Sequence, residues 1–149
     1  MKYLFPIIIL LSMGWTSDSS FSFFEKMKLE PCPNSPNCVS TQETRRRKRM
    51  RPIPFERPLD FSKNKLKVLL EVMIKNIDAT LIEEDGNYLH YEFKTKIGDF
   101  TDDVEFIFDE KNKQIHFRSA SRKGYGDFGK NRRRMKNIRR KFKHIIFYD

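Results

Sequence analysis

The sequence predicts an α+β fold in which an antiparallel sheet of about four strands carries two principal helices packed on one face. Apolar residues recur at helical spacing in the middle of the chain and again near its end. Between these regions lie segments of alternating apolar and polar residues, joined by short polar connections. The length of the chain supports one domain around one hydrophobic core.

The N-terminus has the composition of a signal peptide. Lys2 precedes an apolar run from Tyr3 to Met13, which is short for a membrane span, and small residues near Gly14 suit a cleavage site. An uncleaved N-terminal anchor is the alternative. We expect a signal peptide or anchor at 1–17, a linker at 18–28 and a single domain at 29–149. The expected location is a bacterial periplasm or cell envelope.

Cys32 and Cys38 are the only cysteines, and the residues between them are rich in turn formers. In an oxidising compartment such a pair predicts a disulfide. A zinc site is the sharper alternative, but the three histidines form no ligand cluster with this pair, so no metal site is assigned.

The body of the domain begins with a helix after Asp60 or Ser62, whose apolar face runs from Leu66 to Ile77. Four strands are predicted to follow, and a final helix to end the domain. Their expected ranges are 79–84, 88–96, 103–109 and 114–119 for the strands and about 131–144 for the helix. The short connections at 85–87 and 110–113 favour antiparallel pairing.

Charge is unevenly distributed along this basic chain of net charge +10. The run 45–51 has six bases and no acid, and 118–144 has twelve bases and one acid, whereas 52–117 has nine bases and fourteen acids. The run 45–51 is expected to be a solvated loop, and the alternative is that it meets anionic lipid or a polyanion of the envelope. Because we expect export, no contact with nucleic acid is predicted.

The stretch from Arg118 to Arg134 combines glycines, hydroxyl groups and arginines between a predicted strand and a predicted helix. Glycine allows close backbone approach, and arginine offers two parallel hydrogen bonds to an anion at a helix N-terminus. The candidate anion-binding residues are Arg118, Ser119, Ser121, Arg122, Asn131 and Arg132. The alternative is structural, with these residues paired to Asp102, Asp103 and Asp127.

Two sequence motifs carry a family resemblance. Residues 118–139, RSASRKGYGDFGKNRRRMKNIR, and residues 31–40, PCPNSPNCVS, resemble the signatures of DUF1499, a family of unknown function. Residues 101–106 resemble an acidic strand of the same family. The resemblance covers roughly 29–144 and implies no established reaction or cofactor.

Three classes of function are consistent with these features. We expect a non-catalytic exported module that binds a small anionic ligand, a lipid headgroup of an anionic membrane surface, or an envelope partner. The first alternative is an enzyme acting on an anionic substrate with Asp103 or His116 as acid or base. The second is a purely structural envelope protein. No catalytic residue and no cofactor is assigned.

We predict that mature protein lacks residues 1 to about 14, because the apolar run has the length of a signal-peptide core. Intact-mass analysis of the exported protein measures the new N-terminus. A membrane-bound chain that still begins at Met1 would show that the run is an anchor.

Overall fold

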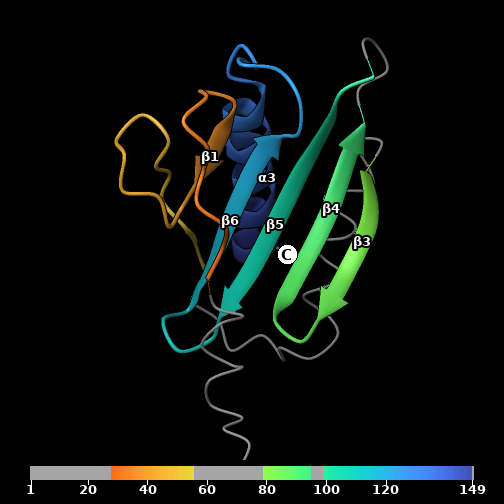
Figure 1. The fold of residues 1–149 in the computed structure, drawn as a ribbon. Helices are drawn as coiled ribbons and strands as arrows, with labels where there is room; N and C mark the ends of the chain where they lie inside the picture. The colour runs from red at the N-terminus through yellow and green to blue at the C-terminus, as the bar shows by residue number, and fades with distance from the viewer. Residues whose placement is uncertain (1–27, 56–78, 95–98, 149) are drawn as a thin grey trace, which may run out of the picture.

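The computed structural model describes residues 28–55, 79–94 and 99–148. Its centre is an antiparallel sheet in the order β1-β6-β5-β4-β3, and β2 pairs with β6 beside this path (Figure 1). The strands are β1 (Cys38–Ser40), β2 (Ile53–Pro54), β3 (Ala79–Asp85), β4 (Tyr88–Lys94), β5 (Thr101–Asp109) and β6 (Gln114–Ser121), and the helix is α3 (Lys130–Tyr148).

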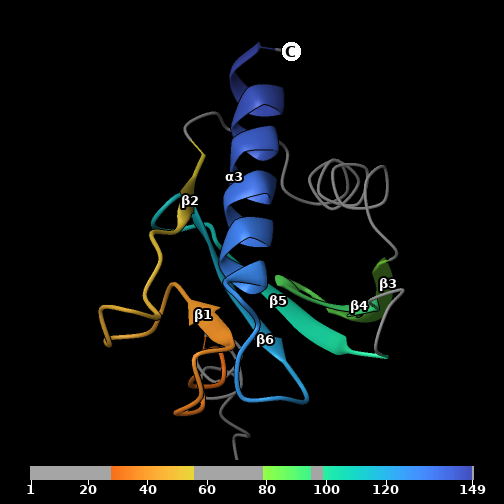
Figure 2. The ribbon, with the colours of Figure 1, turned by 90° about the horizontal axis from the view of Figure 1, so that it is seen from above.

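The hydrophobic core lies between α3 and one face of the sheet (Figure 2). Alternate residues of the long strands supply this face, so that Leu89, Phe106 and Phe117 are fully buried. Met135, Ile138 and Phe142 of α3 recur at helical spacing and complete the core from the other side. The opposite face of β4, β5 and β6 carries the intervening, mostly polar residues.

The prediction of four strands with two principal helices is wrong. The sheet has six strands, and the described residues contain a single helix. β1 and β2 were missed because they are short and proline-flanked, and neither shows an alternating pattern long enough to indicate a strand. Both are stabilised by pairing with β6.

The four longer strands and α3 lie close to their predicted ranges. The helix expected after Asp60 and the N-terminal segment 1–17 fall outside the described residues. Within the part of the chain that is described, no helix has both the length and the apolar character needed to cross a bilayer.

The predicted disulfide between Cys32 and Cys38 is confirmed, with the two Cα atoms 5.7 Å apart. Both cysteines pack against Ala120 of β6. The ammonium of Lys48 is buried and donates hydrogen bonds to the carbonyl oxygens of Pro33 and Ser35, inside the disulfide loop. Two bases of the run 45–51, Lys48 and Arg45, therefore hold this loop in place.

Truncation of a core phenylalanine should destabilise the protein far more than truncation of an exposed one. Phe106 is fully buried, so Phe106→Ala is expected to lower the free energy of unfolding by about 3–5 kcal/mol. Phe128 is 97% exposed, and Phe128→Ala should stay within about 0.5 kcal/mol of the unmodified protein. Urea unfolding of both variants measures the difference, and equal losses would contradict this assignment of the core.

Candidate functional site

The two signature segments meet at the side chain of Asn131, in the first turn of α3. Its amide nitrogen donates to the carbonyl oxygen of Asn37 and to the hydroxyl of Ser121, both at 3.0 Å. Its side-chain oxygen accepts hydrogen bonds from Ser119 at 2.5 Å and from Arg134 at 2.6 Å. Asn131 is buried, and it joins the disulfide loop, β6 and α3.

Arg134 extends this arrangement to β5. Its guanidinium pairs with the carboxylate of Asp102, and a carboxylate oxygen of Asp102 also lies 3.2 Å from the ammonium of Lys130. The guanidinium of Arg134 also stacks on Phe93, 4.7 Å from the centre of its ring. Arg134 and Asp102 are both buried. The name Asn131 network is used below for Asn37, Asp102, Ser119, Ser121, Asn131 and Arg134.

The pKa of Asp102 reflects these partners. Burial raises its pKa, but hydrogen bonds from Ser121 and Arg134 and the charges of Arg134 and Lys130 outweigh burial and leave it below the ordinary value. Asp102 is therefore ionised at neutral pH and balances a buried guanidinium.

Asp127 caps the N-terminus of α3. Its carboxylate accepts hydrogen bonds from the backbone amides of Gly129 at 2.9 Å and Asn131 at 2.8 Å. These amides are among those that a helix start would otherwise offer to an anion. The protein thus supplies its own carboxylate at this position.

Arg118 and Arg122 lie on the outer face of the sheet and pair with protein carboxylates. Arg122 donates to both oxygens of Asp103, at 2.7 and 2.9 Å, and to Glu92, while His90 contacts Asp103 at 2.7 Å. Arg118 donates to Glu105 at 2.7 Å. Of these carboxylates, the structural alternative had named only Asp103. An anion-binding role for the two arginines stays a prediction.

The two residues considered as acid or base are not brought together. Burial raises the pKa of Asp103, but Arg122 and His90 outweigh it and hold the pKa below its ordinary value. His116 contacts Thr41 at 3.1 Å, and burial lowers its pKa. Because His116 pairs with Ile107, four residues along β5 from Asp103, the two side chains are roughly 13 Å apart.

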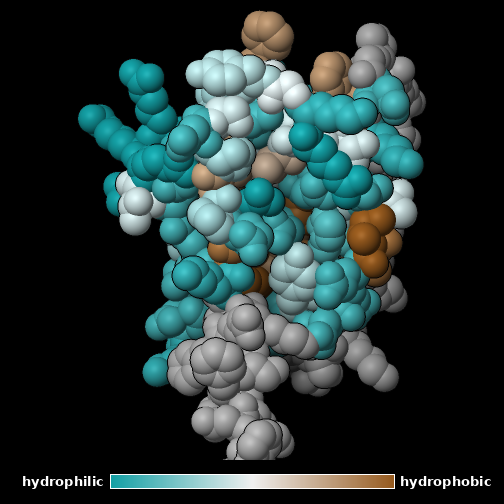
Figure 3. Space-filling view, viewed as in Figure 1, coloured by the Kyte–Doolittle hydropathy of each residue, from teal (hydrophilic) through white to brown (hydrophobic). Residues whose placement is uncertain are grey.

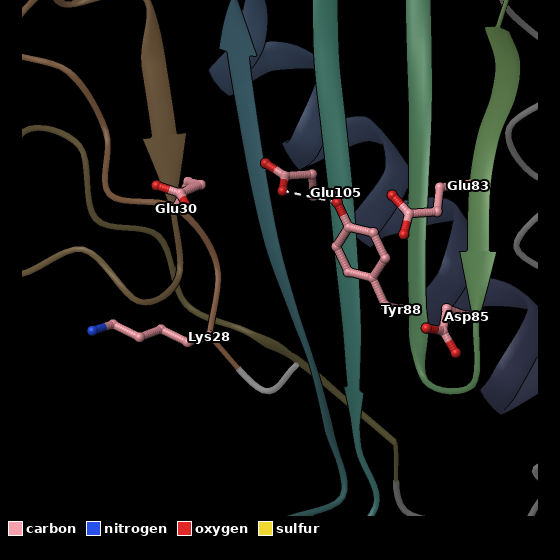
Figure 4. A pocket seen from close by; sticks show the side chains of 6 residues that line it. All are labelled: Lys28, Glu30, Glu83, Asp85, Tyr88 and Glu105. Carbon is pink, nitrogen blue, oxygen red and sulfur yellow. Dashed lines mark hydrogen bonds between the residues drawn. The ribbon is translucent and has the colours of Figure 1, made fainter. Parts of the chain in front are cut away.

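An acidic cavity of about 270 Å³ opens on the outer face near the β3–β4 turn. Figure 4 shows Tyr88 donating to Glu105 across this cavity, at 3.0 Å. Its lining residues are Lys28, Glu30, Glu83, Asp85, Tyr88 and Glu105. Four carboxylates against one ammonium make this cavity unsuitable for an anion. In the described ranges, no group of three or more potential ligands is arranged to hold a metal ion.

A basic surface lies at the other end of the sheet, where the run 45–51 meets the start of α3. The guanidinium of Arg132 donates to the carbonyl oxygen of Arg47, and the two residues border a cavity of about 230 Å³. Gly126, Asp127, Phe128 and Gly129 of the β6–α3 loop also line this cavity, together with Pro36 and Val39. The name basic tip is used below for Arg46, Arg47, Arg49, Lys123, Arg132 and Arg133.

The candidate site residues therefore separate into three groups. Ser119, Ser121 and Asn131 lie inside the protein in the Asn131 network, Arg118 and Arg122 lie on the outer face, and Arg132 lies at the basic tip. Sequence reasoning missed Asn37 and Arg134 as network members, and it missed Arg47 as a neighbour of Arg132. Asn37 stands inside one signature motif and Arg134 inside the other, and no other sequence feature pointed to them.

We predict that Asp102→Asn lowers the free energy of unfolding by about 3–5 kcal/mol, because it leaves Arg134 buried without a balancing charge. It should also make the acid-induced loss of stability shallower. In the unfolded chain the pKa of Asp102 is about 4, and in the folded protein it is lower. The ionised carboxylate therefore contributes fully to stability above about pH 4, and this contribution is lost as the pH falls through the folded-state pKa.

Thermal melts between neutral and acidic pH test both parts of this prediction. Asp99→Asn is the matched control, since Asp99 is exposed and the same chemical change should leave stability nearly unaltered. Equal effects of the two substitutions would contradict a stabilising role of the Asp102–Arg134 pair.

Comparison with known proteins identifies the family of this chain. The model of the family described as "Protein of unknown function (DUF1499)" matches residues 28–142, which span both signature motifs and most of α3. Searches of curated proteins and of solved structures found no significant match. Since the family model covers well over half of the chain, the chain belongs to the DUF1499 family, whose function is unknown.

Proposed function

We propose that this chain is a non-catalytic exported module that binds a phosphate-bearing anionic ligand at the basic tip. The observation that carries the proposal is the contact between Arg132 and the carbonyl of Arg47. It joins segments 85 residues apart, so two basic stretches border one cavity. Arginine is suited to this role because its planar guanidinium gives two parallel hydrogen bonds to phosphate. Export rests on the N-terminal apolar run.

The charges of the basic tip are available to a ligand. Among the described residues, Arg46, Arg47 and Arg49 form no ion pair with a carboxylate, and all three are exposed. Arg118, Arg122 and Arg134 are instead neutralised by Glu105, Asp103 and Asp102. An external anion would therefore be attracted to the tip rather than to the central arginines of the signature.

The phosphate group would lie beside the loop and not on the helix amides. Asp127 already accepts hydrogen bonds from the amides of Gly129 and Asn131, so the side chains of Arg47 and Arg132 supply the positive charge. Gly126 lines the cavity with no atom within 4 Å of the position of an added Cβ, which leaves room for a ligand to approach the backbone.

The outer face supports a structural role better than a catalytic one. Asp103 is ionised and hydrogen-bonded to Arg122 and His90, and it lies roughly 13 Å from His116. A general base that is satisfied by a guanidinium has a lowered affinity for a proton.

Removal of either arginine at the cavity should weaken phosphate binding. We expect Arg47→Gln and Arg132→Gln each to lower the affinity for inorganic phosphate by about tenfold or more, because each removes a charge-assisted hydrogen bond of about 1.5–3 kcal/mol. Phosphate titrations followed by backbone amide chemical shifts measure the affinity and place the ligand.

Arg140→Gln is the matched control for this experiment. Arg140 is exposed on α3, about two turns beyond Arg132, and its loss changes the net charge equally. Equal weakening by all three substitutions would show a non-specific charge effect, and an absence of phosphate binding to the unmodified protein would overturn the proposed function.

A further inference from the structure

The β6–α3 loop exposes two aromatic side chains beside the basic tip. Phe128 is 97% exposed and Tyr125 is 80% exposed. Figure 3 shows light-brown side chains projecting from the upper end of the molecule, and long teal side chains projecting from the upper left, where Figure 1 draws the chain between β1 and β2. Apolar rings and bases therefore protrude at the same end.

A third ring lies at this end. The side chain of Phe100, 45% exposed, lies 3.9 Å from the position of an added Cβ on Gly124. The aromatic residues Phe100, Tyr125 and Phe128 thus come from two segments, one before β5 and one after β6. Single exposed apolar residues are ordinary, whereas several protruding rings at one end indicate a partner.

Phe128 is held in an unfavourable backbone conformation. Its φ is 50°, in the left-handed region that a phenylalanine seldom adopts. The guanidinium of Arg133 donates to its carbonyl oxygen at 2.6 Å, which keeps this conformation in place. The strain is not offset by burial of the ring within the protein, and strain of this kind is concentrated at functional positions.

The β6–α3 loop is also held in place by hydrogen bonds at both of its ends. Asn37 donates to the carbonyl oxygen of Gly124 at 2.6 Å, and Asp127 accepts hydrogen bonds from Gly129 and Asn131. Both ends of the loop are thereby tied to the Asn131 network. The rings are presented on a rigid base, so a partner does not have to order the loop on binding.

We propose that Tyr125 and Phe128 insert into the interfacial region of a bilayer that contains anionic phospholipid, while the basic tip contacts the lipid phosphates. This inference rests on the proposed function and identifies the source of the phosphate as a lipid headgroup. Aromatic rings suit the boundary between headgroups and acyl chains, and neighbouring arginine and lysine are attracted to anionic lipid.

The shape and charge of this end favour a bilayer over a protein partner. The rings protrude and are nearly fully exposed, so they suit a soft surface that they can enter rather than a rigid face that must be complementary in shape. A second copy of the chain would bring Arg47, Arg132 and Lys123 against the same bases, which is repulsive. An anionic bilayer satisfies the rings and the bases together.

Tryptophan placed at position 128 would report insertion directly. The full-length chain is prepared as Trp15→Phe with Phe128→Trp, so that the only tryptophan lies in the loop. It is mixed with vesicles of equal parts phosphatidylcholine and phosphatidylglycerol whose acyl chains carry bromine, a fluorescence quencher. We expect quenching several-fold stronger than in the matched control, Trp15→Phe with Lys111→Trp, whose exposed residue lies in the β5–β6 turn at the other end of the sheet.

Affinity measurements give a second readout. Phe128→Ser should weaken binding of the full-length chain to the mixed vesicles by about tenfold or more, because the variant has no phenylalanine side chain to transfer from water into the bilayer. Binding should also fall with added salt and with vesicles of phosphatidylcholine alone. Thermal melts confirm that the variant is folded, which is expected since the replaced ring makes little contact with the protein.

The outcomes separate this inference from the proposed function. Phosphate binding that depends on Arg47, without quenching at position 128, would overturn membrane insertion and leave the proposed function standing. Equal quenching at positions 128 and 111 would also overturn membrane insertion, since the loop would then lie no deeper in the bilayer than the β5–β6 turn. Self-association that is lost in Phe128→Ser, with no vesicle binding, would show that the rings bind a second copy and would also overturn the inference.

Discussion

The hydrogen bonds of one buried side chain, Asn131, fix how the disulfide loop, β6 and α3 pack together. A side-chain amide has two donor hydrogens and an oxygen that accepts two hydrogen bonds, and Asn131 uses all four. Its partners come from the disulfide loop, β6 and α3, so one buried side chain sets how three segments pack. A polar group at this depth is stable only when it is fully satisfied, and the position of each partner is therefore restricted. The disulfide and Lys48 fix the loop that carries Asn37, which makes them part of the same constraint.

This constraint divides the cationic residues of the signature by role. Arg134 faces inward and balances Asp102, while Arg118 and Arg122 bind carboxylates across neighbouring strands. The bases of the basic tip, by contrast, have no carboxylate partner among the described residues. A motif rich in glycine, hydroxyl groups and arginine thus serves mainly to build a turn and a helix start. The basic tip is the surface whose charges remain available to a ligand.

The local pattern of the sequence was enough to predict the longer strands and the last helix, but it was not enough to predict which side chains contact one another. Alternation in residues 88–94 identified a strand and the face that it buries, because a half-exposed strand imposes a period of two. Residues 103–109 were also identified as a strand, although residues 104–109 of β5 are buried on both faces. The disulfide followed from the spacing of two cysteines around a turn-forming loop. β1 and β2 depend on pairing with β6, and proline gives their segments no strand signature. The contact of Arg132 with Arg47 joins residues far apart in the chain, and no periodicity encodes such a contact.

Acidic and basic side chains lie at opposite ends of the sheet. Carboxylates of Glu83, Asp85 and Glu105 surround the cavity near the β3–β4 turn. The cavity bordered by Arg47 and Arg132 lies at the opposite end of the sheet, where the β6–α3 loop is drawn in Figure 1. In the field of an anionic surface, the acidic end is repelled and the basic end is attracted, so the approaching molecule turns its basic tip toward that surface. The screening length at physiological salt is about 8 Å, which is shorter than the sheet is long. The two ends therefore act as separate charges rather than cancelling, and the exposed rings of Tyr125 and Phe128 are the side chains that such an orientation brings forward.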